Sequence, residues 1–539
     1  PDFNNFIGFN LLENTQGLTY NGMFAGISGG GYNYKDYPFK ANEFKIVNTS
    51  FDKAAAANAK VNLRINAKDI TLFDQPSAAG SGNFANYPLY IGNRGNAVGS
   101  YPLTGDIAEI ILYNRKLSPA EKATIESYLN TKYNIACNVT TPQPGSGNCL
   151  QMGNFGAYAM DDADIDFGGN DFTIEFWTLK RALTSNVYNC QVVNKWNSGN
   201  VPGSNEWAIA TSSDGFNNIP SFNIESGTTI YKADATSSLS VNKWYHIAAV
   251  REGNVLKIYV NGILEGTTTI PPGTIINNVA ARTFMAMGYI AEAPYYSNNS
   301  NLDELRIWNT ALSQTTIRDW MCKKESAIHP NHAALTRYYR FDEPNGTIFG
   351  NQVNNCVTEA YSSGGIITTS GAPIGDNSVY NYTGNTASAN INFGTVSDNF
   401  AATMNAGTSA GIHLYAVNEL PNNQNYPGVP GNNKYAGVFV VNGDAAAAYN
   451  ATYNYTNNTA VTVALEPNLK LFKRTDNAAL VWSEANNQVL NTGLNTIVTA
   501  GQNTEYVLAN AVTPVAPVCY GSFNANDLLN VTNFTDSYS

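Results

Sequence analysis

The chain has 539 residues, a formal net charge of −11 and an isoelectric point near 4.9, with only 30 lysines and arginines. Nucleic acids and anionic membranes are bound through basic patches, so this charge argues against both as partners. Charged residues make up 13% of the chain and aromatic residues 12%, and no run approaches the roughly 18 apolar residues of a membrane span. The composition favours an all-β extracellular or cell-surface protein, and the length predicts three or four domains.

The first region, residues 1–136, consists of short apolar stretches separated by turns rich in Gly and Asn. Residues 61–66 alternate with period two, which predicts a half-buried strand. Ser118 is suited to cap a helix, because Pro119 fits the first helical position and Glu121 completes a capping box. We expect this helix to bury an apolar stripe made of Ile125, Tyr128, Leu129 and Tyr133.

A linker at 137–148 carries two Pro and two Gly in twelve residues, which prevents regular structure. The region that follows, 149–322, contains an alternating strand at 172–178. Residues 244–250 and 256–262 read as a β-hairpin, and Asn261-Gly262 is a strong signal for a second turn.

One motif occurs in both regions. Residues 109–118 read E-I-I-L-Y-N-R-K-L-S and residues 304–313 read E-L-R-I-W-N-T-A-L-S, 195 positions apart (304 − 109). Each copy predicts a short strand, a turn at Asn and a Leu-Ser step into a helix, with Ser313 as the second cap. A repeat at this spacing is too long for a solenoid unit, so it indicates two copies of one domain.

The remaining chain divides into three parts. Residues 323–375 read as an extension with one clear strand at 335–343. Residues 376–511 predict a small β-sandwich, because turns recur every 8–12 residues. Its strands are expected at 389–395, 411–417, 436–442, 448–455, 460–465, 469–474 and 504–509. Residues 512–539 read as a linker and the start of a further module, and the opening at Pro1 suggests part of a larger, processed protein.

Three stretches of the second region together resemble laminin-G-like domains of the concanavalin A type. They are D-F-T-I-E-F-W-T at 171–178, K-W-Y-H-I-A-A-V-R-E-G-N-V-L-K-I-Y-V-N-G at 243–262 and L-D-E-L-R-I-W-N-T-A-L-S at 302–313. The first region matches over its latter part, at 88–95 and 105–121, and its opening strands are short or absent. The resemblance implies two jelly-roll sandwiches, at 1–136 and 149–322, followed by the smaller β-sandwich.

The order of these domains is similar to that of large surface proteins of the Bacteroidota, including gliding-motility adhesins exported by the type IX secretion system. Segments at 412–421, 432–441 and 502–508 carry that similarity. It implies a non-catalytic part of a secreted adhesin that binds glycans or surfaces through jelly-roll loops, with other domains of the same protein as partners. The alternatives are a structural spacer or filament-forming protein, and the carbohydrate-binding region of a polysaccharide-degrading enzyme.

The resemblance also implies a structural Ca²⁺, because jelly rolls of this kind often hold one at one end. Asp303 is the candidate ligand, with oxygens near Asn154 and Gly156 as partners, since calcium takes six to eight oxygen ligands. The first copy has Ala108 at the matching position, which predicts a weaker or missing site there. The alternative is a hydrogen-bonded Asp at the start of a strand.

Catalysis is not expected. Glycosidases of this fold place two carboxylates on one strand face, whereas Asp303 and Glu304 are adjacent and would point to opposite faces of a regular strand. Among the four histidines, His246 reads as a core residue inside a strand, and His329 and His332 read as part of a plain loop.

Sugar binding needs exposed aromatic rings beside amide or carboxylate groups. The loops at 194–207 and 293–301 have that composition, and the candidate ligand-binding residues are Trp196, Asn205, Tyr295, Tyr296 and Asn298. The alternative is that the tryptophans belong to the core and that Tyr-Asn loops are common on this surface.

Six cysteines are present and none forms a C-x-x-C pattern. Cys137 and Cys149 bracket the linker, and Cys322 and Cys356 bracket part of the extension. A local disulfide is possible at each place, and the alternative is free thiols.

Overall fold

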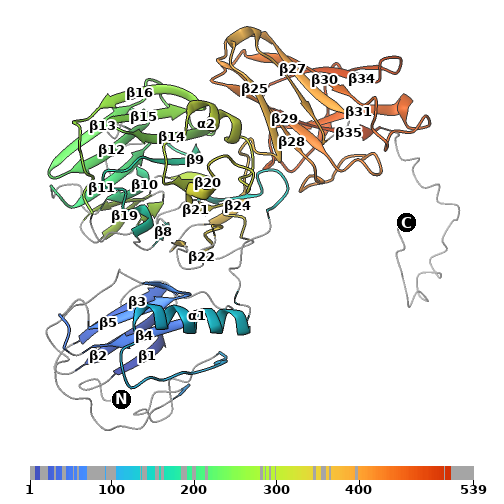
Figure 1. Cartoon of the computed structure of the whole chain (residues 1–539). Coiled ribbons are helices and arrows are strands. Elements are labelled where there is room, and N and C mark those ends of the chain that lie inside the picture. The colour runs from blue at the N-terminus through green and yellow to red at the C-terminus, as the bar shows by residue number, and fades with distance from the viewer. Residues whose placement is uncertain are drawn as a thin grey trace, which may run out of the picture.

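The structure is a computed structural model. It describes residues 7–12, 22–28, 32–38, 44–52, 54–56, 60–69, 91–92, 105–133, 135, 142–151, 157–159, 163–183, 191–196, 202–212, 217–278, 283–285, 287–290, 293–297, 299–343, 348–353, 360–362, 366–394, 398–502 and 504–511. None of the helices in these ranges has the length and apolar character needed to cross a membrane. Almost all regular structure is antiparallel β-sheet (Figure 1), which confirms the predicted all-β class.

The described residues of the N-terminal region form two three-stranded sheets and one helix. The first sheet is formed by β1 (Ile7–Leu12), β2 (Gly22–Ser28) and β3 (Tyr32–Pro38), and the second by β4 (Val47–Phe51), β5 (Val61–Ile65) and β6 (Lys68–Asp69). Buried and half-buried residues alternate along β5, which confirms the half-buried strand predicted there.

The helix α1 (Pro119–Tyr133) begins as predicted, with a reciprocal capping box. Glu121 N donates to Ser118 Oγ at 3.3 Å, and Ser118 N donates to the Glu121 carboxylate at 2.8 Å. The buried face of the helix differs from the predicted apolar stripe, because it carries Lys122 and Glu126. These side chains meet polar groups of β5: Arg64 Nε donates to Glu126 at 2.9 Å and Lys122 Nζ to Asn62 at 2.5 Å.

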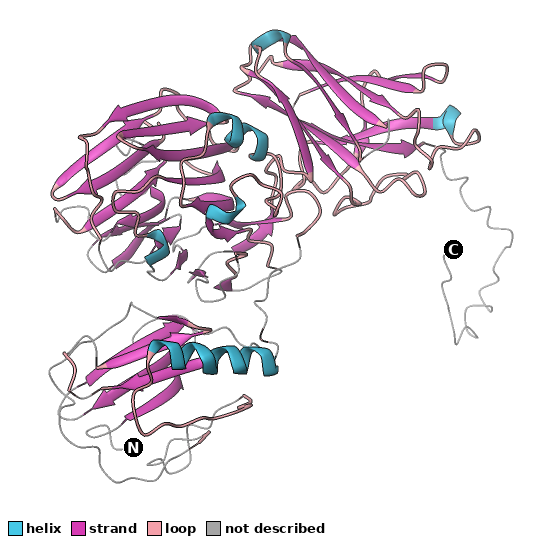
Figure 2. Cartoon of the chain, in the orientation of Figure 1, coloured by secondary structure: helices cyan, strands magenta, loops and turns pink. Residues whose placement is uncertain are grey.

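The first copy of the repeated motif is not a strand. Residues 105–113 form an extended loop (Figure 2) that precedes α1. The second copy is the central strand β20 (Ser300–Trp308), and Ser313 caps α2 (Gln314–Trp320) by accepting from Thr316 N at 3.1 Å. The predicted strand at 109–113 is therefore wrong for the described structure, although the helix that follows each motif is confirmed.

The second domain is a sandwich of two large antiparallel sheets, with a core between them (Figure 1). One sheet has the order β13 (Thr229–Asp234), β12 (Ser221–Ser226), β11 (Asn205–Ala210), β10 (Gln191–Trp196), β17 (Thr283–Met285), β8 (Ala157–Ala159), β23 (Ala360–Ser362), β22 (Ile348–Phe349). The other has the order β16 (Ile263–Thr269), β15 (Val255–Val260), β14 (Trp244–Glu252), β9 (Phe172–Lys180), β20, β7 (Asn148–Gln151), β24 (Ile366–Thr369), and β21 (Leu335–Tyr339) also pairs with β20. The short elements η3 (Ala163–Ile165), η4 (His332–Ala334) and the hairpin β18 (Met287–Ile290) with β19 (Ala293–Ser297) complete the domain.

Residues 323–375 belong to this sandwich. The strands β21, β22, β23 and β24 enter its two sheets, and β24 pairs with β7 along Ile366–Thr369. The sequence reads this segment as an extension because only its first strand is long enough to show a pattern. The predicted hairpin is confirmed, since β14 pairs with β15 and the following turn places Asn261 and Gly262 at φ of +51° and +72°.

The third domain is the predicted small β-sandwich. One sheet has the order β25 (Asn377–Asn381), β28 (Gly411–Val417), β29 (Tyr435–Val441), β35 (Thr504–Asn510), β31 (Leu469–Arg474), β32 (Ser483–Glu484), and the other β26 (Ser388–Asn392), β27 (Asn399–Ala406), β30 (Ala448–Asn454), β34 (Thr496–Gly501), β33 (Val489–Asn491). The short helices η5 (Gly384–Thr386) and η6 (Glu466–Asn468) lie in its connections. The strand expected at 460–465 is instead a series of turns that leaves Val463 88% exposed.

The second and third domains share a buried interface. Trp177 on the outer face of β9 meets the Phe439 ring edge to face at a centroid distance of 5.4 Å. Hydrogen bonds also cross the boundary at Asn261, in the turn after β15. Asn261 Nδ2 donates to Asn442 Oδ1, and Tyr382 OH donates to Asn261 O, both at 2.8 Å. The apolar members of this interface are Trp177, Met321, Cys322, Ala372, Ile374, Tyr415, Val417, Tyr435, Phe439, Val441, Trp482 and Val507.

This interface predicts that the two domains unfold together. Replacing Phe439 by Ala removes the ring that packs on Trp177, so we expect a loss of about 3 kcal/mol in the free energy of unfolding. Differential scanning calorimetry of the full chain should show this loss as a lower unfolding temperature of both domains. Val463→Ala, at an exposed position, should stay within about 0.5 kcal/mol of the parent. A Phe439→Ala midpoint equal to that of the control would contradict the shared interface.

Candidate functional site

The strand β20 carries a β-bulge at its two neighbouring acids. Asp303 lies opposite Trp177, and the next two residues of β20 oppose a single residue of β9. Glu304 accordingly takes a left-handed φ of +49°, which is uncommon for a residue with a side chain. The bulge turns Asp303 and Glu304 toward the same outer face, while Leu305 enters the core. The prediction that the two carboxylates point to opposite faces is therefore wrong, because it assumed regular alternation.

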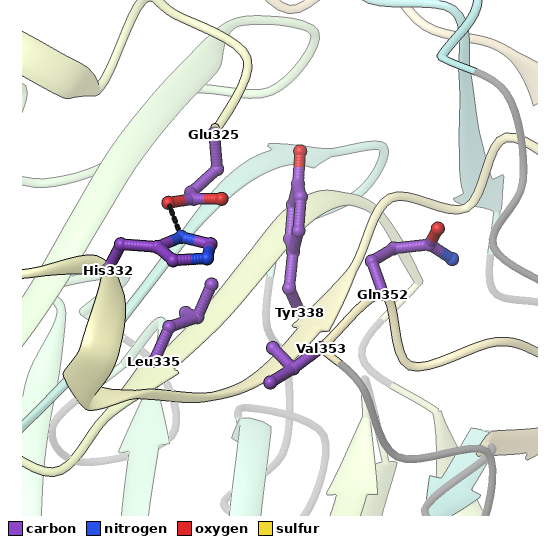
Figure 3. Close-up of a pocket in the computed structure, with 6 residues that line it drawn as sticks. All are labelled: Glu325, His332, Leu335, Tyr338, Gln352 and Val353. Carbon is purple, nitrogen blue, oxygen red and sulfur yellow. Dashed lines mark hydrogen bonds and ion pairs between the residues drawn. The ribbon is translucent and has the colours of Figure 1, made fainter. Parts of the chain in front are cut away.

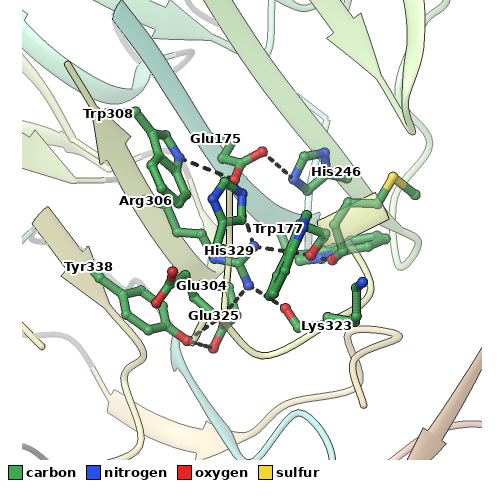
Figure 4. A network of polar contacts seen from close by, with 12 residues as sticks. Glu175, Trp177, His246, Glu304, Arg306, Trp308, Lys323, Glu325, His329 and Tyr338 are labelled. Atoms are coloured by element: carbon green, nitrogen blue, oxygen red, sulfur yellow. Dashed lines mark hydrogen bonds and ion pairs between the residues drawn. The ribbon is translucent and has the colours of Figure 1, made fainter. Parts of the chain in front are cut away.

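A buried guanidinium organises the outer face above this bulge (Figure 4). Arg306 Nη1 donates to Trp320 O at 3.1 Å, and Nη2 donates to Lys323 O at 2.6 Å. Nη2 also donates to the Glu304 carboxylate, which accepts a second bond from Tyr338 OH at 2.6 Å. Hydrogen-bonded partners of opposite charge are what allow an arginine to be buried at 1% exposure.

Glu175 lies on β9 at the other end of this network. Its carboxylate accepts from Trp308 Nε1 at 3.2 Å and lies 3.6 Å from both Arg306 Nη1 and His246 Nε2. Burial raises the pKa of Glu175 to about 7, and the nearby Arg306 opposes this shift only in part. Burial also lowers the pKa of His246 well below its usual range. The predicted core position of His246 is confirmed by its 2% exposure.

His329 closes the network over the two tryptophans. Its ring stacks on Trp308 at a centroid distance of 4.3 Å and lies 4.6 Å from the Trp320 ring. Its Nδ1 accepts from Asn331 N at 3.0 Å, and burial lowers the pKa of His329 to about 3. The imidazole is therefore neutral near pH 7 and serves as a packed aromatic group.

A pocket of about 260 Å³ opens beside Tyr338 (Figure 3). Its lining residues come from the loop before η4, from η4, from β21 and from the segment after β22; they are Glu325, His332, Leu335, Tyr338, Gln352 and Val353. His332 Nδ1 and the Glu325 carboxylate are 2.9 Å apart, with the imidazole 46% exposed and the carboxylate 4% exposed. The pocket thus combines four side chains that carry hydrogen-bonding groups, Glu325, His332, Tyr338 and Gln352, with an apolar wall.

The fold of this domain can now be compared with known proteins. Residues 152–318 match the family model described as the concanavalin A-like lectin/glucanases superfamily. The second domain is a concanavalin A-like jelly roll. The match ends at residue 318, before β21, so the strands added by residues 335–369 and all six residues that line the pocket lie beyond it. No curated protein sequence matches the chain significantly.

Solved structures with low similarity include three proteins whose descriptions concern carbohydrates. A protein of Bacteroides ovatus to which carbohydrate binding is ascribed is 16% identical over 44% of this chain and 64% of that chain, with a TM-score of 0.34. Domain 4 of the arabinanase AbnA from Geobacillus stearothermophilus, in complex with arabinotriose, is 17% identical over 29% and 68%, with a TM-score of 0.23. The sialidase module CBM40 of Ruminococcus gnavus, bound to α2,3 sialyllactose, is 11% identical over 32% and 96%, with a TM-score of 0.26. The chain thus spans slightly less than two thirds of the first of these proteins.

Asp303 is enclosed in the concanavalin A-like domain. Its side chain is fully buried, Oδ1 accepts from Glu304 N at 2.8 Å and Oδ2 accepts from Ser370 Oγ at 2.5 Å. Burial and the neighbouring Glu304 raise the pKa of Asp303 well above its usual range. The described residues hold no group of three or more His, Cys, Asp or Glu side chains that could hold a metal ion. The other predicted ligands, Asn154 and Gly156, lie outside the described residues.

The predicted sugar platform at Trp196 is not available in the concanavalin A-like domain. Trp196 ends β10 opposite Asn205, and the two residues are 6% and 2% exposed. The strand β10 contacts β18, so the hairpin that contains residues 293–297 lies next to β10. The backbone of Tyr295 and Tyr296 lies in β19, whereas their side chains and the whole of Asn298 lie outside what the structure describes.

Cys149 and Cys322 carry free, buried thiols, which departs from the two disulfides considered from the sequence. Asn301 Nδ2 donates to Cys149 Sγ at 3.6 Å, and Cys322 packs in the interface with the third domain. Burial raises the pKa of both thiols, so neither is a reactive thiolate near pH 7. Their considered partners, Cys137 and Cys356, lie outside the described residues.

Sequence reasoning missed the pocket in the concanavalin A-like domain. In the sequence, His332 reads as part of a plain loop, and Gln352 and Val353 lie in a segment without a clear pattern. The strand at 335–339 is the sequence feature that could have indicated the pocket. A strand that joins a buried sheet brings its flanking loops to the surface of the domain. The partner strand and the pairing register come only from tertiary structure.

The raised pKa of Glu175 predicts a pH-dependent cost in stability. An acid whose folded-state pKa lies above its unfolded value destabilises the fold as pH rises from about 4.5 to about 7. A shift from 4.5 to about 7 corresponds to on the order of 3 kcal/mol. We therefore expect Glu175→Gln to melt higher than the parent at pH 8, with the difference shrinking toward pH 5.

Thermal melts across this pH range give the measurement. Glu484→Gln, at a side chain that is 49% exposed, is the control. If the melting temperatures of the two variants, relative to the parent, depended on pH in the same way, the buried carboxyl of Glu175 would not be the cause of the stability difference.

Proposed function

We propose that the concanavalin A-like domain is a non-catalytic carbohydrate-binding domain, with the pocket beside Tyr338 as its sugar site. The pocket is the observation that carries this proposal. Its volume of about 260 Å³ lies slightly below the roughly 300–1,000 Å³ of pockets for drug-sized ligands, which suits a single sugar residue. Glu325, His332 and Gln352 offer hydrogen-bonding groups for hydroxyls, and Leu335 and Val353 form an apolar wall for ring carbons.

The burial and hydrogen bonding of Asp303 and Glu304 support the non-catalytic part of the proposal. Glycosidases use two carboxyl groups that flank the scissile bond. Asp303 and Glu304 share a face, but both are buried, and their oxygens are held by Ser370, Arg306 and Tyr338. A substrate would have to displace these bonds before either acid could act.

The same proposal extends to the biological setting. We place the chain in a secreted or surface-anchored adhesin, of the Bacteroidota gliding type exported by type IX secretion, which binds glycans away from the cell. The acidic, Asn- and Tyr-rich composition and the domain order support this setting. A second candidate is a structural spacer, which the buried interface between the second and third domains favours because it makes them one stiff unit. A third candidate is the sugar-binding region of a polysaccharide-degrading enzyme.

Calcium at Asp303 stays a proposal taken from the resemblance. It would require the carboxylate to leave Ser370 and to meet oxygens near Asn154 and Gly156. If calcium binds there, its addition after treatment with EDTA should raise the melting temperature of the full chain by mass action. An unchanged melting temperature would leave Asp303 as a buried, hydrogen-bonded carboxyl.

The sugar site is tested by a glycan array with the full chain, followed by calorimetric titration of the best glycan. His332→Ala removes an exposed hydrogen-bonding group from the pocket, so we expect roughly a tenfold loss of affinity. Glu325→Gln should also weaken binding, because it removes the carboxylate charge that holds the His332 imidazole in place.

Lys470→Ala is the matched control, since Lys470 also forms one half of a surface ion pair, with Glu484 at 2.9 Å. It should bind like the parent. Binding that His332→Ala and Glu325→Gln leave unchanged would move the site away from this pocket, and an array without any bound glycan would favour the spacer.

A further inference from the structure

A lysine and two acidic side chains meet in the concanavalin A-like domain, and none of them lines the pocket beside Tyr338. Lys195 lies on β10 and Glu206 on the neighbouring strand β11, and both side chains are fully buried. Lys195 Nζ lies 2.7 Å from Glu206 Oε1 and also contacts Asp166 Oδ1. A further polar group reaches the same acid, because Asn278 Nδ2 donates to Asp166 Oδ2 at 3.0 Å. One ammonium group is thus held between two carboxyl groups.

A β-bulge between the two strands brings Lys195 and Glu206 together. In the pairing of β10 with β11, Lys195 opposes Trp207. The next residue of β10, Trp196, opposes Asn205. Glu206 is therefore the extra residue of the bulge, and a bulge changes the direction of a side chain. Because Trp207 belongs to the core and opposed residues share a face of the sheet, Lys195 points toward the interior of the sandwich.

The chain neighbours of Asp166 fix its position. Asp166 follows η3 in the connection between β8 and β9, which lie in different sheets. Its neighbours Ile165 and Phe167 both enter the core. The Phe167 ring stacks on Phe172 at a centroid distance of 3.9 Å. From β11, Trp207 Nε1 donates to Ile165 O at 3.5 Å. A packed backbone segment therefore presents this carboxyl group to the lysine.

Burial changes the chemistry that an amine and two acids can perform. In water, an amine and a carboxylic acid form an ammonium carboxylate salt, which does not condense. A buried site penalises charge, so transfer of a proton from the ammonium to a carboxylate is favoured there and gives a neutral amine beside a neutral acid. The neutral amine is a nucleophile, and the carbon of the protonated carboxyl group is its electrophile. A second carboxylate in contact with the nitrogen can take a proton and return it.

We propose that Lys195 and Asp166 join through an amide bond between their side chains, with Glu206 as the catalytic base and acid. The Lys195 ammonium transfers one proton to Asp166 Oδ1, and Nζ then attacks Cγ. Glu206 takes a second proton from the nitrogen and delivers it to Oδ1, which leaves as water when its bond to Cγ breaks. The Asn278 N–H stabilises the negative charge that Oδ2 carries in the tetrahedral intermediate. The ammonium has then lost two protons and the carboxylate one oxygen, so the reaction needs no oxidant, reductant or other co-reactant.

The amide bond fastens the connection between the two sheets to β10. It closes a loop of chain from residue 166 to residue 195, and a cross-link of this kind stabilises a fold mainly by restricting the unfolded chain. The bond is independent of the sugar site, because the two share no residue.

Mass spectrometry of the purified full chain under denaturing conditions tests the bond. We expect the main species to be lighter than the sequence by one water. After digestion with trypsin, the segments that contain Asp166 and Lys195 should appear as one branched peptide, and cleavage after Lys195 should be absent. Glu206→Gln keeps the size of the side chain but removes the proton acceptor, so this variant should keep the full mass and release two separate peptides.

Glu484→Gln is the control, because Glu484 also pairs with a lysine but is 49% exposed. This variant should show the same loss of one water as the parent, and the peptides of Glu484 and Lys470 should stay separate. The parent decides the bond even if Glu206→Gln does not fold. A parent of full mass would overturn the proposal and leave Lys195 in a buried ion pair. A loss of water that maps elsewhere, such as a succinimide at the Asp214-Gly215 step, would overturn it as well. A branched peptide that persists in folded Glu206→Gln would overturn the role of Glu206.

Discussion

The pairing of β9 with β20 is the constraint on which the second domain depends, because both faces of this strand pair are buried. The inner face carries Phe172, Ile174 and Phe176 into the core between the two sheets. The outer face carries Glu175 and Trp177, which a strand of alternating pattern would usually expose to water. Polar and aromatic groups on the outer face therefore need partners from elsewhere in the chain.

Those partners come from three separate segments. The end of α2 and the loop after it bring two backbone carbonyls to Arg306, β21 brings Tyr338 to Glu304, and the third domain brings Phe439 to Trp177. The bulge at Glu304 makes this possible, since it adds one residue to β20 and puts a second acid on the outer face. Residues 323–375 and the third domain thus complete the jelly roll, and the pocket beside Tyr338 forms at the rim of this covered face.

The two copies of the motif show how neighbouring strands decide whether its apolar residues are buried. In the second copy, neighbouring strands pair with the backbone and cover the apolar residues, so that Trp308 is fully buried. In the first copy, the matching Tyr113 is 49% exposed. Similar residues therefore end in different environments, because burial depends on which strands lie beside the motif and cannot be read from the motif itself.

Local signals in the sequence determined the local elements. The capping box at Ser118, the N-cap at Ser313, the hairpin turn at Asn261-Gly262, the alternation of β5 and the strand β9 all depend on residues close in the chain, and the structure confirms them. Only the tertiary structure decided the bulge at Glu304, the polar face of α1, the burial of Trp196 and the pocket beside Tyr338. Each of these depends on a partner far along the chain, such as Arg64 for Glu126, and pairing between distant segments leaves no periodic trace in the sequence.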